Sequence, residues 1–111
     1  MASQPAIRIL LRMHFGLPFR QASDAERKKV GETMTEVFQS WKASGIRLLG
    51  TFGSGAHVGG FAHYMLFDVD DPGKANEIDR SIFGGEIGKY IENFDVHVGM
   101  NRAQVEDVWK S

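Results

Sequence analysis

Residues 6–15 alternate between two kinds of side chain. The first kind is apolar and occupies every second position: Ile7, Ile9, Leu11, Met13 and Phe15. The second kind is mostly basic: Arg8, Leu10, Arg12 and His14. A period of two is typical of a β-strand, because successive side chains of a strand point to opposite faces of its sheet. We therefore expect a strand here, with one face in the core and an unusually basic second face.

A pattern with the period of an α-helix follows. Ser23 and Glu26 have the spacing of a capping box, in which both side chains satisfy backbone N–H groups at the start of a helix. Apolar residues then recur at spacings of three and four: Val30, Met34, Val37, Phe38 and Trp41. Such a stripe packs one face of a helix on a core. Gly45 is placed where helices commonly end, so the sequence predicts a long helix before it.

Three further strands are expected, at residues 46–52, 61–69 and 94–100. The strand at residues 61–69 carries apolar side chains on both faces, which is typical of a central strand. The glycine-rich segment 53–60, which contains His57, predicts a loop because ordering so many glycines costs conformational entropy.

Shorter helical segments are expected in the second half of the chain. Asp70 and Asp71 followed by Pro72 are typical of a helix start. The inner side of that helix would carry Ala75, Ile78 and Ile82. A further helical turn is expected at residues 86–91, and Asn101 can cap a short terminal helix.

Size and charge limit the class of protein. The 111 residues suit one domain spanning residues 1–111, and 42% hydrophobic residues suffice for one core. The formal net charge of −1 is too small to hold nucleic acid or an anionic membrane, so we expect neither as a partner. The chain has no cysteine and no signal-like or membrane-spanning segment near its first residue. We expect a cytoplasmic protein.

The order of these elements predicts an α+β fold of βαββαβ layout, with both main helices on one face of a four-stranded antiparallel sheet. The other face is too apolar to remain in water. Strand parity places on it Leu10, Leu49, Tyr64 and Leu66. A second copy of the chain would cover this face, so we expect a homodimer; a monomer with a tolerable apolar patch is the alternative.

Three segments resemble the dimeric α/β-barrel proteins of the ferredoxin-like fold: the run Gly45–Gly50, the turn Val69–Pro72 into a helix, and the strand segment Phe94–Val96. That superfamily includes cofactor-free monooxygenases, polyketide cyclases, muconolactone-type isomerases, haem-degrading enzymes and many uncharacterised proteins. The resemblance covers most of the chain and implies a dimer with a ligand pocket between sheet and helices.

Strand parity also decides which polar residues share a face. We expect Arg12 opposite Asp95 and near Tyr64, on the face turned away from the helices. Arg8 should lie near Asp68, and His97 near Leu10. His63 should face the helices and be buried beneath one of them.

This cluster has two interpretations. In the structural one, ion pairs and satisfied histidines fix the strand register. In the functional one, His14 and His97 are catalytic acids or bases, and the ligand is held by Arg12, Tyr64, Leu10, Leu49, Leu66 and Asp95. No spacing of histidines and carboxylates indicates a metal, and we expect no cofactor.

The function classes compatible with such a pocket are therefore few. The first is a protein that binds a small hydrophobic or amphiphilic ligand and acts as a cofactor-independent monooxygenase, isomerase or cyclase. The second is a non-catalytic binding protein for a carboxylate of fatty-acid type. A purely structural role is the third, and the sequence leaves open whether the chain is an enzyme.

Overall fold

The computed structural model describes residues 6–53 and 63–110. Its four strands form one antiparallel sheet in the order β2-β3-β1-β4. Their bounds are Ile7–Phe15 for β1, Arg47–Gly53 for β2, His63–Val69 for β3 and Ile91–Met100 for β4. The glycine-rich loop predicted at residues 53–60, including His57, lies almost wholly outside the described residues.

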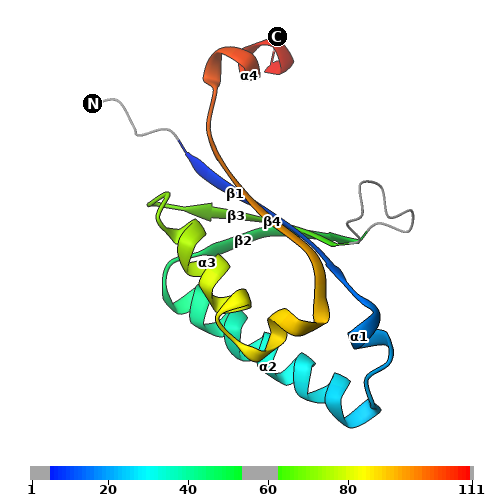
Figure 1. The fold of residues 1–111 in the computed structure, drawn as a ribbon. Coiled ribbons are helices and arrows are strands. Elements are labelled where there is room, and N and C mark those ends of the chain that lie inside the picture. The colour runs from blue at the N-terminus through cyan, green and yellow to red at the C-terminus, as the bar shows by residue number, and fades with distance from the viewer. Residues whose placement is uncertain (1–5, 54–62, 111) are drawn as a thin grey trace.

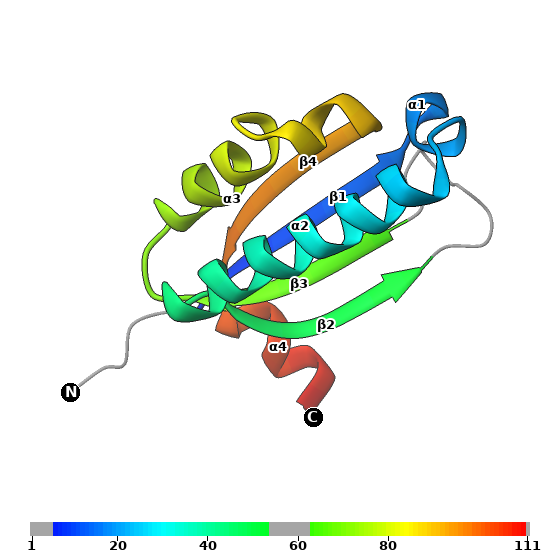
Figure 2. The same cartoon turned by 90° about the horizontal axis from the view of Figure 1, so that it is seen from below.

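Helices lie on both sides of this sheet. Their bounds are Leu17–Arg20 for α1, Asp24–Ala43 for α2, Lys74–Phe83 for α3 and Ala103–Lys110 for α4, with a 3₁₀ helix η2 at Glu86–Tyr90. Helices α2 and α3 cover one face, whereas α4 lies on the other side of the sheet (Figures 1 and 2). We call the surface turned away from α2 and α3 the open face.

The predicted α+β class with a four-stranded antiparallel sheet is confirmed. The bare six-element βαββαβ order is not matched, because α1 stands between β1 and α2 and because α4 follows β4. Helix α1 was not predicted from the sequence. It begins with Pro18 in its first turn, a position where the missing N–H of proline costs no hydrogen bond.

The core lies between the sheet and the helices on its covered side. Four alternate residues of β1 are buried in it: Ile7, Ile9, Leu11 and Met13. The facing helices contribute Val30, Met34 and Trp41 from α2 and Ile78 and Ile82 from α3. The Trp41 indole donates a hydrogen bond to Ser81 Oγ at 3.0 Å, which joins the two helices. The predicted core face of β1 and most of the predicted inner stripes of both helices are therefore confirmed; the exception is Phe38, which is 37% exposed.

Local signals set most of the element ends. The capping box of Ser23 and Glu26 is present at the start of α2, and Gly45 after its end has a positive φ of 91°. The start predicted for α3 was too early. Pro72 lies in a turn, in which Asp71 Oδ1 accepts a hydrogen bond from Gly73 N at 2.9 Å, and the α-helix begins at Lys74. Strand β4 begins at Ile91, three residues before the expected strand.

A β-bulge reverses the parity of β2 halfway along it. The pairing with β3 shifts between Leu48 and Gly50, so Leu49 has no position in the regular ladder. Phe52 consequently pairs with Tyr64 and lies on the open face, where its ring covers Gly50; a Cβ added at Gly50 would be 2.9 Å from Phe52 Cζ. Strict alternation from Leu49 would place Phe52 on the helix side, and the bulge reverses that placement.

Candidate functional site

The expected cluster on the open face is present in the register that strand parity predicted. Arg12 is paired with Asp95 on one side and with Tyr64 on the other. Its Nε donates to Asp95 Oδ1 at 2.9 Å and its Nη2 to Asp95 Oδ2 at 2.5 Å. His97 Nε2 lies 3.1 Å from the same Oδ2. Three of the predicted site residues therefore form one hydrogen-bonded group.

Hydrogen bonds control the charge of this group. Those from Arg12 lower the pKa of Asp95 below its ordinary value of 3.8, against an opposing effect of partial burial, and His97 lowers it further. The carboxylate is therefore anionic at neutral pH. Because Arg12 holds the carboxylate in a bidentate pair, the charge of the guanidinium is already neutralised. The group is therefore better suited to fixing the register of the strands than to binding an anion.

A second ion cluster lies further along the open face. Arg8 Nη1 donates to Asp68 Oδ1 at 2.6 Å, as the strand pairing predicted, and Arg47 shares the same carboxylate from β2. This cluster joins three strands, β1, β2 and β3. Unlike the first, it carries one positive charge in excess, because two guanidinium groups share one carboxylate.

The two histidines predicted to be catalytic do not converge. His14 is paired with Asn93, and its Nε2 lies 3.9 Å from Glu92 Oε2, whereas His97 is paired with Leu10. Four strand positions separate the two sites along β1, which corresponds to about 13 Å. Each histidine therefore belongs to a different part of the open face.

The predicted apolar ligand residues are only partly brought together. Leu10 and Leu66 are direct neighbours across β1 and β3. Leu49 is in the bulge and half exposed. The bulge brings Phe52 to the open face beside Tyr64, a neighbour that parity counting missed. Gly50, a glycine inside the expected strand, is the signal that could have indicated the bulge.

The larger of two cavities in the described parts of the chain lies on the opposite, helix-covered side. It has a volume of about 720 Å³ and lies between α2 and the strands β2 and β3. Its apolar lining comprises Met13, Phe15, Met34, Phe38, Trp41, Ile46, Leu48, Met65 and Phe67. Helix α2 crosses β1 and β3 and leaves β2 at the margin of the helical layer (Figure 2). We call this space the α2–β2 cavity.

None of the eight predicted site residues lines the α2–β2 cavity, whose described polar lining consists of Lys42, Arg47, Thr51 and His63. His63 faces the helix side as predicted, since it pairs with Met13, but it is exposed at the end of β3 instead of buried. Its ring meets the edge of Phe15, with 6.0 Å between centroids. The pocket was expected where polar residues share a face, but most of those residues pair with one another instead.

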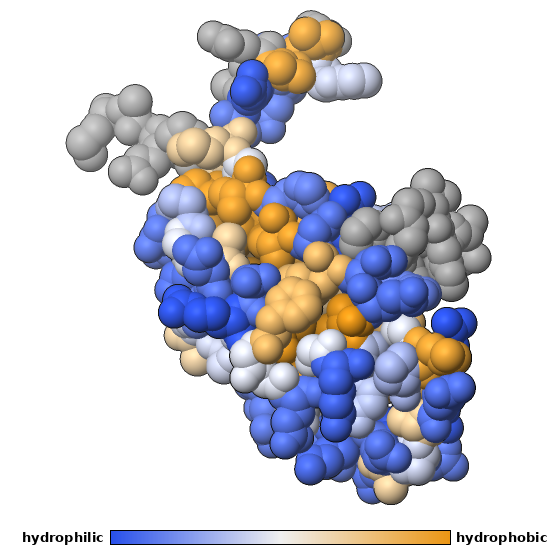
Figure 3. All heavy atoms as spheres, in the orientation of Figure 1, coloured by the Kyte–Doolittle hydropathy of each residue, from blue (hydrophilic) through white to orange (hydrophobic). Residues whose placement is uncertain are grey.

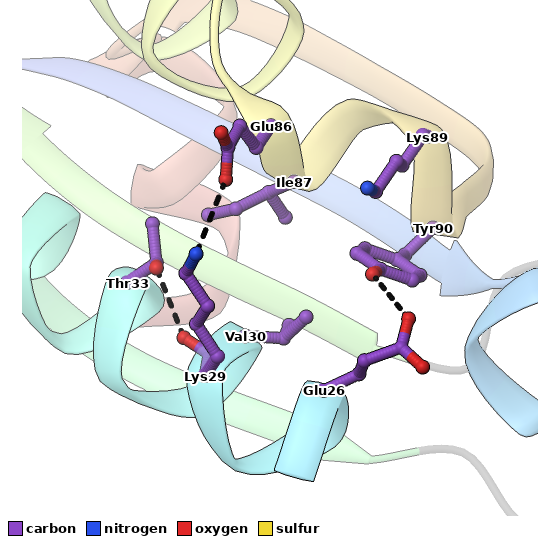
Figure 4. Close-up of a pocket in the computed structure, with 8 residues that line it drawn as sticks. All are labelled: Glu26, Lys29, Val30, Thr33, Glu86, Ile87, Lys89 and Tyr90. Carbon is purple, nitrogen blue, oxygen red and sulfur yellow. Dashed lines mark hydrogen bonds and ion pairs between the residues drawn. The ribbon is translucent and has the colours of Figure 1, made fainter. Parts of the chain in front are cut away.

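A second cavity, of about 150 Å³, separates the first half of α2 from η2 (Figure 4). Polar side chains of α2 and η2 pair across it. Lys29 Nζ lies 4.0 Å from Glu86 Oε2, and the Tyr90 hydroxyl donates to Glu26 Oε2 at 3.4 Å. Hydrogen bonds from the Ser23 backbone and side chain, more than that of Tyr90, lower the pKa of Glu26. This volume holds only about five water molecules, so we assign the cavity a structural role in holding η2 on α2.

Within residues 6–53 and 63–110, no group of three or more histidine, cysteine or acidic side chains is placed to hold a metal ion. None of the described helices combines the length and the apolar composition needed to cross a bilayer.

Comparison of the chain with protein families, with curated proteins and with solved structures found no match in any of the three. The functional assignment therefore depends on the geometry of the chain itself.

Proposed function

We propose that the protein binds a small amphiphilic carboxylate in the α2–β2 cavity. The observation that carries this proposal is the combination of a largely apolar lining and a volume of about 720 Å³, within the range of about 300–1,000 Å³ typical of small-molecule sites. A cavity of this kind favours a ligand that buries an apolar body and keeps one polar end near the rim.

The polar residues lie near the two ends of the cavity. Lys42 and Arg47 come from the end of α2 and the start of β2, whereas His63 comes from the far end of β3, where it pairs with Gly53. Arg47 is already bound to Asp68. Lys42 has no ion pair within the described parts of the chain, so its ammonium group is the natural partner for an acidic head group.

A second candidate function uses the open face. It is the cofactor-independent monooxygenase, isomerase or cyclase chemistry expected from the sequence, with His97 or His14 as the acid or base. The contact of His97 with Asp95 at 3.1 Å favours it, because a carboxylate can fix the orientation of a catalytic imidazole. In this candidate, an apolar ligand would lie along Leu10 and Leu66.

We also propose that the chain is a variant of the ferredoxin-like fold and forms a dimeric α/β barrel. Two features support this: the strand order β2-β3-β1-β4, with α2 and α3 on one face, and the partly apolar open face, which a second sheet would cover. The extra helices α1 and α4 then lie outside the common layout.

Tryptophan substitutions at two neighbouring positions test where the ligand binds. Met65 faces the α2–β2 cavity and Leu66 faces the open side, on the same strand. Saturated fatty acids of eight to sixteen carbons would be titrated against both variants by thermal shift and calorimetry. We expect Met65→Trp to lose at least about tenfold in affinity, because the indole fills the cavity, and Leu66→Trp to bind like the unaltered protein.

The histidine side chains provide an independent readout. Their imidazole NMR signals can be assigned by single His→Gln variants, since the chain has four histidines. A ligand in the α2–β2 cavity shifts the His63 signals, whereas one on the open face shifts those of His97 or His14. Binding that is lost in Leu66→Trp and moves His97 overturns the first proposal in favour of the second.

A further inference from the structure

The α2–β2 cavity has polar side chains at both ends of an apolar wall. On β3 the wall consists of three alternate residues: His63, Met65 and Phe67. The four strand positions from His63 to Phe67 correspond to about 13 Å. Phe67 pairs with Leu48 near the start of β2, and α2 ends directly before β2 begins (Figure 2). Lys42, in the last turn of α2, therefore stands at the opposite end of the cavity from His63.

This arrangement sets the cavity apart from other apolar surface of the chain. Hydrophobic residues also gather on α4 and on the body of the molecule below it (Figure 3). The α2–β2 cavity differs from these patches because its apolar wall lies between a helix and two strands and has polar residues at each end. Its occupant must therefore match a polar, an apolar and again a polar surface in this order.

Two polar side chains stand close together at the far end of the cavity. Thr51 pairs with Met65, and His63 pairs with Gly53, so Thr51 and His63 are diagonal neighbours on β2 and β3. Such neighbours lie about 7–8 Å apart, a separation that one bridging oxygen atom can span. The ring of Phe15 supports the imidazole in an edge contact, with 72° between the ring planes. Within residues 6–53 and 63–110, neither the imidazole of His63 nor the hydroxyl of Thr51 forms a hydrogen bond.

The two ends of the cavity differ in charge. Lys42 and Arg47 are the cationic side chains of the described lining, and both stand at the end formed by α2 and the start of β2. The other end offers the hydroxyl of Thr51 and the imidazole of His63. A hydroxyl can both donate and accept a hydrogen bond, and so can a neutral imidazole. This end therefore suits an uncharged hydroxyl group better than a second carboxylate.

We propose that the ligand of the α2–β2 cavity is an ω-hydroxy carboxylic acid. Its carboxylate lies beside Lys42, its chain lies along Met65 and Phe67, and its terminal hydroxyl lies between His63 and Thr51. This inference rests on the proposed function and adds the class of acid and the two residues that select it. Both His63 and Thr51 are exposed, so a chain that ends in a methyl group there remains in contact with water, whereas a hydroxyl is hydrogen-bonded.

Calorimetry with three acids of twelve carbons tests the proposal on the unaltered protein. The acids are dodecanoic acid, 12-hydroxydodecanoic acid and its isomer 6-hydroxydodecanoic acid. We expect the 12-hydroxy acid to bind about three- to tenfold more tightly than dodecanoic acid, the gain typical of one net hydrogen bond. The 6-hydroxy isomer should bind more weakly than both, because its hydroxyl group is left unpaired against the apolar wall.

Two substitutions of similar shape identify the residues that bind the hydroxyl group. His63→Phe keeps a ring beside Phe15, and Thr51→Val keeps a β-branched side chain. Each should abolish the preference for the 12-hydroxy acid and leave the affinity for dodecanoic acid within about twofold. Thr35→Val, on an exposed position of α2, is the matched control and should keep the preference.

The outcomes separate this inference from the proposed function. Equal binding of dodecanoic and 12-hydroxydodecanoic acid, or a preference that persists in both His63→Phe and Thr51→Val, overturns the inference and leaves the proposed function standing. Failure of all three acids to bind the unaltered protein overturns both.

Discussion

Arg12 and Asp95 face each other across β1 and β4 in a bidentate pair, with Nε 2.9 Å from Oδ1 and Nη2 2.5 Å from Oδ2. Both side chains are about one-third exposed. A pair in this position stabilises one register of two neighbouring strands, because a slip of one residue would turn every side chain of a strand to the other face. The pair is therefore a determinant of the fold as well as part of the open face.

Replacement of Asp95 should give a stability difference that depends on pH. The pKa of Asp95 is lower in the folded protein than its ordinary value of 3.8. Its carboxylate therefore contributes stability that is complete above the unfolded value and is lost as the pH falls through the lower folded value. Asp95→Asn should lower the free energy of unfolding by about 1 kcal/mol at pH 7 and by progressively less below pH 4.

Urea denaturation from pH 7 to pH 2.5 measures this difference. Asp107→Asn, on the exposed helix α4, removes the same charge and serves as the control. A difference between Asp95→Asn and the unaltered protein that stays constant over the whole range would contradict the ion-pair role.

Two glycine substitutions should change the free energy of unfolding in opposite directions. Gly45 has a φ of 91°, a conformation that costs a residue with a Cβ about 1 kcal/mol, so Gly45→Ala should be destabilising by about that amount. Gly31 is in the middle of α2, and a Cβ there would meet no atom within 4 Å. Gly31→Ala should therefore stabilise the protein by about 0.5–1 kcal/mol. Thermal and urea denaturation measure both changes in the free energy of unfolding. Two changes of the same sign would contradict the account of how α2 ends.

Much of the fold was predictable because its signals are local. The alternation of β1 and the stripe of α2 each repeat often enough to fix a period, and the Ser23–Glu26 capping box marks a helix start within four residues. The pairing of Arg12 with Asp95 followed from the same parity, once β1 was placed between its two neighbours. Regular elements thus carry enough repeated information in the sequence to define their faces.

The bulge in β2 was not predictable in this way. One residue inserted at Leu49 reverses the parity of the rest of a short strand. Gly50 directly after it is a local sign of a bulge, but a single glycine does not fix which residue is the extra one. The α2–β2 cavity was missed for a related reason. Its size depends on where α2 crosses the sheet, which is a matter of packing among many side chains, and each residue of its wall has the composition of ordinary core.

The hydrogen bond between α2 and α3 should contribute to stability. Ser81→Ala removes the acceptor of the Trp41 indole and leaves that buried N–H unsatisfied, at a cost of about 1–3 kcal/mol. Trp41→Phe removes the N–H together with part of the packing on Phe67, whose ring centroid lies 5.6 Å away. In a double-mutant cycle by urea denaturation, Ser81→Ala should cost much less in the Trp41→Phe background, and strict additivity would show that the bond contributes nothing.

Charge reversal at Lys42 should distinguish the head group of the ligand from its tail. If the ammonium group binds a carboxylate at the end of the α2–β2 cavity, Lys42→Glu should weaken binding of a fatty acid by at least about tenfold, the loss expected for a hydrogen bond between charged groups. Binding of the alcohol of the same chain length should change little, because its tail contacts are retained. Lys28→Glu, on an exposed part of α2, makes the same change in net charge and controls for long-range effects. Calorimetry at two salt concentrations measures the affinities of the unaltered protein and of both variants for the acid and the alcohol. An equal loss for acid and alcohol, or for both variants, would contradict the placement of the carboxylate beside Lys42.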